Sequence, residues 1–146
     1  EVFSAQFNLL TEVWQKGLDH LEQVVGASEE SKRPQATSDL RVARAAGLHF
    51  ASCANQARFI VARDRLQSLK ETTDQRETLC RELITLIDRE IDLARHLYEL
   101  TLVDTRIGFE ASCHYFYVPL DIVEKVISCE DIRQQILNEC RGEKGK

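Results

Sequence analysis

The chain has 146 residues, of which 43% are hydrophobic and 29% are charged, and its formal net charge is −5. These values are typical of a single soluble globular domain with a core of its own. The negative charge argues against a nucleic-acid partner or an acidic membrane surface. No apolar run of about 18 residues occurs, so no transmembrane segment is expected. No signal peptide is visible, and the sequence indicates no compartment.

The chain contains no methionine and begins inside a helical pattern, so we expect it to be part of a larger protein. Its five cysteines are odd in number and include no CxxC pair. Cys53, Cys80 and Cys129 lie near apolar stripes, which predicts small buried hydrophobes rather than a disulfide framework. Without paired ligands at zinc spacing, we expect no metal site and no cofactor.

A first helix is predicted over residues 4–25, because apolar residues recur there in steps of three and four. Gly26 ends this pattern. The polar stretch 26–36, which contains Pro34 and clustered charges, is predicted to be a linker inside the domain. The apolar positions of the first helix are Phe7, Leu10, Trp14, Leu18, Leu21 and Val25.

A second helix is predicted from Thr37 or Ser38 to about Lys70. Its middle, "ARAAGLHFASCANQARFIVA", is rich in small and apolar residues on most of its circumference. A helix of this kind is contacted on several sides, so we expect it to be central.

A third helix is predicted after "TTDQ", residues 72–75, which fits a capping box, and is expected to run to about Val103. At a rise of 1.5 Å per residue this helix would span about 45 Å. Its inner face is predicted to contain Leu83, Ile87, Ile91, Ala94, Tyr98 or Leu97, and Thr101.

A last helix is predicted from Pro119, which suits a first helical turn, with a break at "SCED", residues 128–131, left open. The segment "CHYFYV" is the one stretch that resembles a strand. The sequence therefore predicts an all-α domain over 1–146, an antiparallel bundle of about four or five helices. Two of these helices are long, and an irregular aromatic loop precedes the last one.

No P-loop, GxGxxG, GxSxG, HExxH or Glu-x-x-His motif occurs, and no catalytic residue is assigned. Arg44 and His49 have the Arg-x4-His spacing of helical-bundle ribonucleases, in which an Arg steadies a phosphate and a His moves a proton. The alternative is a solvated Arg44 and a half-buried His49 without chemistry. A ribonuclease is therefore only a third hypothesis.

The segment "RIGFEASCHYFYVP", residues 106–119, differs from the rest of the chain because aromatic, acidic and basic residues meet there without a clear period. Sugar sites use this mixture, since aromatic faces stack on sugar rings while charged groups bind the hydroxyls. The structural alternative is a plug at the end of the bundle, with Asp104 and Arg106 paired to fix the turn. The candidate substrate contacts are Arg106, Glu110, His114, Tyr115 and Tyr117.

The run "LARHLYELTLVDTRIGFEASCHYFYVPLDIVEKVISCEDI" resembles the C-terminal helical region of large, mostly uncharacterised bacterial proteins of glycoside-hydrolase-like architecture. The resemblance rests on Asp104, Arg106, Ile107, Gly108, Glu110, Ala111, His114 and Tyr115, followed by the "DIVEKV" helix. It implies a catalytic barrel elsewhere in the parent protein, with the aromatic loop lining its cleft. The same pattern implies Asn where this chain has Cys113.

The sequence leads to two functional hypotheses from different classes. The first is a non-catalytic, cleft-completing accessory domain of a carbohydrate-active protein, whose partners would be other domains of the parent chain and a carbohydrate. The second is a helical interaction or dimerisation module without a ligand, which predicts a large apolar face completed by a partner. A homo-oligomer is compatible with either function.

Overall fold

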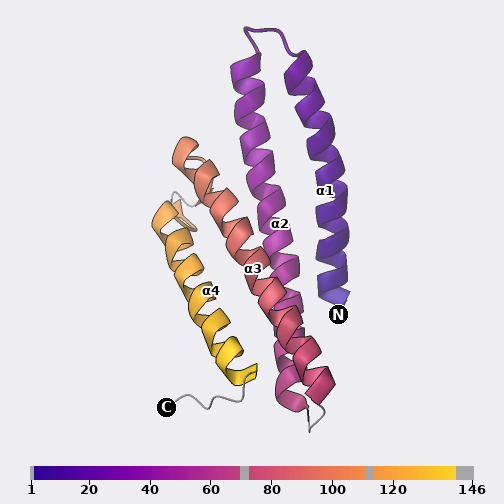
Figure 1. Ribbon diagram of the computed structural model, residues 1–146. Coiled ribbons are helices and arrows are strands. Elements are labelled where there is room, and N and C mark those ends of the chain that lie inside the picture. Colours follow the sequence, from indigo (N-terminus) through magenta and orange to yellow (C-terminus); the bar gives the residue numbers. More distant parts are fainter. Residues whose placement is uncertain (1, 70–72, 111–113, 141–146) are drawn as a thin grey trace.

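The computed structural model describes residues 2–69, 73–110 and 114–140. The four helices are α1 (Val2–Ala27), α2 (Arg33–Ser68), α3 (Thr73–Val103) and α4 (Pro119–Cys140). They run alternately up and down, and a loop with two very short strands separates α3 from α4 (Figure 1). The predicted all-α fold of four antiparallel helices is confirmed, and α2 and α3 are the long pair.

The helices are arranged in an open row rather than around one closed centre (Figure 1). Within the described residues, α1 packs on α2, α2 on α3 and α3 on α4, and no other pair of helices has closely approaching backbones. Both α2 and α3 therefore have two helical neighbours, whereas α1 and α4 form the edges. The expected central position of the second helix is confirmed.

The contact between α1 and α2 depends on the large side chain of Trp14 and on a glycine, Gly47, opposite it. The indole of Trp14 donates a hydrogen bond to the carbonyl of Ala43 (2.8 Å) and meets the ring of Phe50 edge-on. A Cβ at Gly47 would lie 2.9 Å from the Trp14 ring. Gly47 therefore leaves the space that the indole occupies.

The hydrophobic core lies between α2, α3 and α4. Leu83 of α3 is completely buried, and Ala62 and Leu66 of α2 and Ile136 of α4 pack around it. The predicted inner face of the third helix is confirmed, since five of its positions are buried: Leu83, Ile87, Ile91, Ala94 and Thr101.

The structure corrects the expected bounds of the linker and answers the open question of a break in the last helix. The polar linker is confined to residues 28–32, because α2 already begins at Arg33 with Pro34 in its first turn. A proline fits there since its missing N–H would have no partner in the helix. The helix α4 continues through residues 128–131 without a break. The predicted capping residue Thr72 lies outside the described residues.

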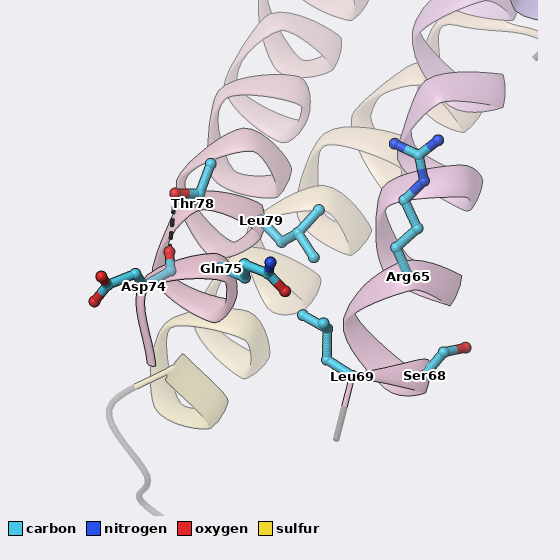
Figure 2. A pocket seen from close by; sticks show the side chains of 7 residues that line it. All are labelled: Arg65, Ser68, Leu69, Asp74, Gln75, Thr78 and Leu79. Atoms are coloured by element: carbon cyan, nitrogen blue, oxygen red, sulfur yellow. Dashed lines mark hydrogen bonds between the residues drawn. The ribbon is translucent and has the colours of Figure 1, made fainter. Parts of the chain in front are cut away.

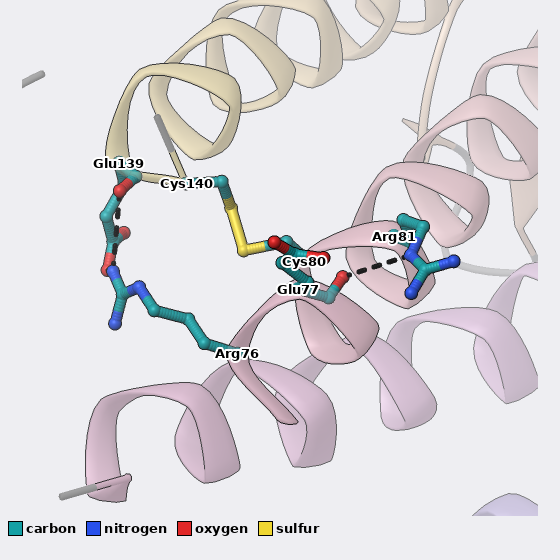
Figure 3. Close-up of a disulfide and its surroundings, with 6 residues drawn as sticks. All are labelled: Arg76, Glu77, Cys80, Arg81, Glu139 and Cys140. Carbon is teal, nitrogen blue, oxygen red and sulfur yellow. Dashed lines mark hydrogen bonds and ion pairs between the residues drawn. A yellow bond between two sulfur atoms is a disulfide. The ribbon is translucent and has the colours of Figure 1, made fainter. Parts of the chain in front are cut away.

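The cysteines correct another expectation, because Cys80 and Cys140 form a disulfide (Figure 3). Their Cα atoms are 6.3 Å apart, and the bond joins the first turns of α3 to the end of α4. Beside it, Arg76 of α3 pairs with Glu139 of α4 at 3.0 Å. Spacing along the sequence could not indicate this pairing, because the two cysteines are 60 residues apart. Cys53 and Cys129 are half-buried free thiols.

Candidate functional site

The loop between α3 and α4 is a small hairpin. Its strands β1 (Phe109–Glu110) and β2 (His114–Tyr115) pair antiparallel, so Phe109 is opposite Tyr115. Gly108 enters the hairpin with φ of +88°, a conformation that residues with a Cβ rarely adopt. A Cβ at this position would lie 2.5 Å from the carbonyl oxygen of Tyr117. The glycine therefore lets the two ends of the loop approach closely.

Arg106, a predicted ligand contact, is occupied by contacts within the chain. Its guanidinium donates to both carboxylate oxygens of Asp104, at 3.0 and 2.7 Å. It also donates to the hydroxyl and carbonyl of Ser38 on α2, at 2.5 and 3.1 Å. The hydrogen bonds from Arg106 to Asp104 hold the pKa of the buried Asp104 carboxyl at about 2. The pair joins the end of α3 to the beginning of α2.

The two tyrosines of the loop contact the protein itself. The hydroxyl of Tyr115 donates to the carbonyl of Thr105 at 3.1 Å, and its ring meets Phe109 edge-on. Tyr117 is half-buried against Gly108, and its ring lies parallel to that of His49 with centroids 6.5 Å apart. Burial raises the pKa of Tyr117.

Glu110 and His114 are backbone partners in the hairpin. Their side chains lie outside the described part of the structure, as does the whole of Cys113, so their sugar-contacting role stays a prediction. Three rings of the loop are exposed to solvent, Phe109 by 50%, Tyr115 by 46% and Phe116 by 75%.

Arg44 and His49, the residues with ribonuclease spacing, have different neighbours. Arg44 pairs with Glu22 of α1 at 2.8 Å, on the solvent side of the contact between α1 and α2. His49 is exposed and lies beside the Tyr117 ring. The structure thus gives each of them a separate partner within the chain.

A polar cluster between α2, α3 and α4 was not predicted. Its centre is Glu90 of α3, which is only 5% exposed. The ammonium of Lys125 from α4 lies 2.5 Å from Oε1 of Glu90, and the hydroxyl of Ser52 donates to the same oxygen at 2.5 Å. The amide of Asn55 donates to Oε2 at 2.9 Å and to the carbonyl of Leu86 at 2.8 Å. One carboxylate therefore joins three helices.

The charge of Glu90 is stabilised within this cluster. Burial alone would raise its pKa, but hydrogen bonds from Lys125, Ser52 and Asn55, together with the charge of Lys125, lower it. A carboxylate with a lowered pKa and several donors is a poor proton acceptor. We therefore interpret this cluster as a structural link rather than a catalytic base.

One polar atom of the cluster is unsatisfied. The amide nitrogen of Asn55 donates two hydrogen bonds, one to the carbonyl of Leu86 and one to Glu90, and these fix the orientation of the side chain. Its oxygen, Oδ1, is the one buried side-chain polar atom without a hydrogen-bond partner among the described residues. A groove of about 210 Å³ runs beside the cluster, where burial raises the pKa of the Cys129 thiol. Asn55 itself is among the residues that line this groove.

A second hollow lies at the turn between α2 and α3 (Figure 2). It has a volume of about 510 Å³ and includes Arg65, Leu69 and Leu79 in its lining. Residues 70–72 beside it lie outside the described part of the chain. We therefore assign no site to this hollow.

The edge helix α1 has a second surface, on which exposed apolar side chains alternate with polar residues and a glycine. At 100° per residue, its members fall within an arc of about 80° on the helix. Val2, Leu9, Val13 and Val24 are exposed by 76, 56, 58 and 58%. We call this surface the outer face of α1, and it consists of Val2, Gln6, Leu9, Val13, Gly17, His20 and Val24. This surface was not predicted from the sequence, because the inner stripe with Trp14 and Leu18 dominates the apolar pattern of this helix.

No described helix has both the length and the hydropathy to cross a membrane. Within the same residues, no three His, Cys, Asp or Glu side chains gather as metal ligands would. Comparison of the chain with protein-family models, with curated proteins and with solved structures finds no match.

Proposed function

We propose that this chain is a non-enzymatic helical interaction module that binds a protein surface on the outer face of α1. The observation that carries the proposal is an edge helix on which six large apolar side chains are exposed, Val2, Phe3, Leu9, Leu10, Val13 and Val24. Exposed apolar residues are common singly, but several gathered on one helix are typical of an interaction surface.

The energetics favour a partner on this face. Burying a Val or Leu side chain contributes roughly 1.5–3 kcal/mol, and Val2, Leu9, Val13 and Val24 are more than half exposed. Gly17 lies between them, and a Cβ there would meet nothing within 4 Å. A partner backbone can therefore approach closely at this point.

The two buried acids with a lowered pKa, Asp104 and Glu90, also fit a structural role. Asp104 is held by Arg106, and Glu90 is held by Lys125, Ser52 and Asn55. Both carboxylates are stabilised in their charged form, whereas a general acid or base works best with a pKa near the operating pH.

The proposal can be tested by photo-crosslinking in the full-length protein within its own cells. p-Benzoylphenylalanine is placed at Val13 and, as a matched control, at Arg63, an exposed polar position on α2. Position 13 should yield one adduct of defined mass that is lost when Leu9→Glu is added, and position 63 should yield none. No adduct from position 13, or the same adducts from both positions, would overturn the proposal.

A second candidate function is the accessory domain of a carbohydrate-active protein, which is supported by the exposed rings of Phe109, Tyr115 and Phe116. Aromatic faces of this kind stack on sugar rings. The test is titration of oligosaccharides against the full-length parent, followed by NMR or calorimetry. Phe116→Ala, Glu110→Ala and His114→Ala should each weaken binding. Unchanged affinity in all three folded variants would exclude the loop as a sugar contact.

A further inference from the structure

We infer that the groove between α2, α3 and α4 binds a small neutral aromatic molecule that carries a hydroxyl group. This groove has a volume of about 210 Å³ and lies beside the ion pair of Glu90 and Lys125. No residue of α1 lines it, so the inference is independent of the interaction surface proposed above.

The greater part of the groove is apolar. Its lining includes one aromatic and three aliphatic side chains, Phe59, Leu86, Ile87 and Ile132. The Cys129 thiol also lines it, and because burial raises the pKa of this thiol, it stays uncharged at neutral pH. An apolar cavity of about 150 Å³ is large enough for benzene, whereas drug-sized ligands usually occupy at least about 300 Å³. A volume of about 210 Å³ therefore fits one substituted aromatic ring.

The lining is polar at one end only. On α2 and α4 the polar lining residues precede the apolar ones by about one turn, and on α3, which runs the opposite way, they follow them. The polar residues of the three helices therefore meet at one level, and they are Asn55, Gln56, Glu90 and Lys125. A molecule with an apolar body and a single polar group fits this division.

The charges at this polar end cancel each other. The carboxylate of Glu90 is paired with the ammonium of Lys125 and also accepts hydrogen bonds from Ser52, Asn55 and Gln56. An anionic ligand at Lys125 would have the carboxylate of Glu90 as its neighbour, and a cationic ligand would find that carboxylate already paired. A neutral ligand is therefore favoured over either charged kind.

Two hydrogen-bonding groups at the polar end have no partner within the described residues. An ammonium group has three N–H bonds, and that of Lys125 uses them for Glu90 and the Ser52 hydroxyl, which leaves one free. The second group is Oδ1 of Asn55, a buried acceptor without a donor. Both side chains hydrogen-bond the carboxylate of Glu90, so the two groups lie close together.

A hydroxyl group matches this combination. It accepts a hydrogen bond from the free N–H of Lys125 and donates one to Oδ1 of Asn55. Because Oδ1 is shielded from solvent, the lining side chains adjust as the ring enters, which is common in ligand and partner binding. Phenol is the simplest molecule with these properties, and its small size limits the dissociation constant to the order of 0.1–1 mM.

NMR titration of the unmodified chain with phenol, toluene, anisole and benzoate tests the chemistry of the ligand. Phenol should bind more tightly than toluene by about threefold or more, although a purely apolar groove would prefer toluene. Anisole accepts a hydrogen bond but donates none, so it should also bind more weakly than phenol. Toluene or anisole binding as tightly as phenol would exclude the hydroxyl, and benzoate binding most tightly would exclude a neutral ligand. No binding of phenol would overturn the inference.

Alkylation of two free thiols locates the bound molecule. Cys129 lines the groove, whereas Cys53, which is also half-buried, does not. At a phenol concentration about four times the dissociation constant, the reaction of Cys129 with iodoacetamide should slow about fivefold. Peptide mass spectrometry should show no change at Cys53. Equal slowing of both thiols, or none at Cys129, would overturn the inference.

A matched pair of substitutions on α4 tests the place of binding without the thiols. Ile132→Phe adds bulk to the groove wall, and Ile127→Phe makes the same change outside the lining. Both isoleucines are partly exposed, so circular dichroism should show that both variants are folded. Ile132→Phe should weaken phenol binding about fivefold or more by filling the groove, and Ile127→Phe should leave it unchanged. Phenol affinity that is the same in both variants would show that the molecule binds elsewhere.

Discussion

The ammonium nitrogen of Lys125 lies 2.5 Å from a carboxylate oxygen of Glu90, and this ion pair joins the edge helix α4 to α3. Ser52 of α2 donates to the same oxygen, so the contact extends over three helices. Because Glu90 is 5% exposed and Lys125 is about one-third exposed, the pair is only partly accessible to solvent. Its two members therefore depend on each other more than a surface ion pair would.

Removing Lys125 should destabilise the protein, since the carboxylate of Glu90 would keep its burial but lose its counter-charge. We expect Lys125→Met to lower the free energy of unfolding by about 1–3 kcal/mol in urea denaturation. The double variant Lys125→Met/Glu90→Gln should lose less free energy of unfolding than the sum of the losses in the two single variants. Lys32→Met, in the exposed pair with Glu29, is the control and should change stability by less than about 0.5 kcal/mol. Additive effects of Lys125→Met and Glu90→Gln would show that the pair is not coupled.

Asp104 should make stability depend on pH at the acid end. Its folded pKa is about 2, below the ordinary 3.8, so the folded state favours the charged carboxylate. The resulting stabilisation is present above about pH 4 and is lost as pH falls from about 4 to about 2, amounting to at most about 2 kcal/mol. Asp104→Asn should remove this part of the profile when thermal unfolding is followed from pH 2 to 7. Parallel profiles for both proteins would show that Asp104 is not its source.

Loss of the disulfide should destabilise the region where α3 meets the end of α4. The bond closes a loop of about 60 residues, and opening such a loop costs about 2–4 kcal/mol through the greater freedom of the unfolded chain. Cys140→Ser, or dithiothreitol added to the unmodified chain, should lower the urea midpoint to a similar extent. Cys53→Ser, at a free half-buried thiol, should retain the response to dithiothreitol. If dithiothreitol lowers the urea midpoint of Cys140→Ser as much as that of the unmodified chain, the disulfide is not the cause of the effect.

Gly108 should not tolerate a side chain. Gly108→Ala combines a positive φ with a clash at the Tyr117 carbonyl, and we expect a loss of about 1–3 kcal/mol in unfolding free energy. Gly26→Ala is the matched control, because Gly26 lies within α1 and a Cβ there would meet no atom within 4 Å. This control should be neutral or stabilising by up to about 1 kcal/mol. Equal effects of the two changes would contradict the strain at Gly108.

The helices could be predicted from the sequence because each one buries a stripe of regular period. Leu83, Ile87 and Ile91 illustrate this, since their spacing alone indicates one face of α3. Glu90 lies on the same face and interrupts the apolar pattern, which was a usable signal for a buried polar contact. Its partners on α2 and α4 are brought to it only by tertiary packing.

Long-range pairings explain the rest of what the sequence could not predict. Cys80 and Cys140 meet because α3 and α4 form an antiparallel hairpin of suitable length, and no local motif indicates this. Pro34 was taken as part of a linker, although a proline is equally suited to the first turn of α2. Arg106 was predicted as a ligand contact or a turn-fixing partner, and the position of Ser38 beside it depends on the fold.

The open row of helices also has a consequence for how the protein unfolds. When each element is stabilised only by its nearest neighbours, stability is approximately a one-dimensional sum of separate pairwise contacts. A covalent bond and a buried ion pair hold the α4 end of this row, whereas no disulfide attaches α1 to the described part of the chain. Hydrogen exchange should therefore be fastest in α1, which would fray as a cooperative unit before the rest of the domain.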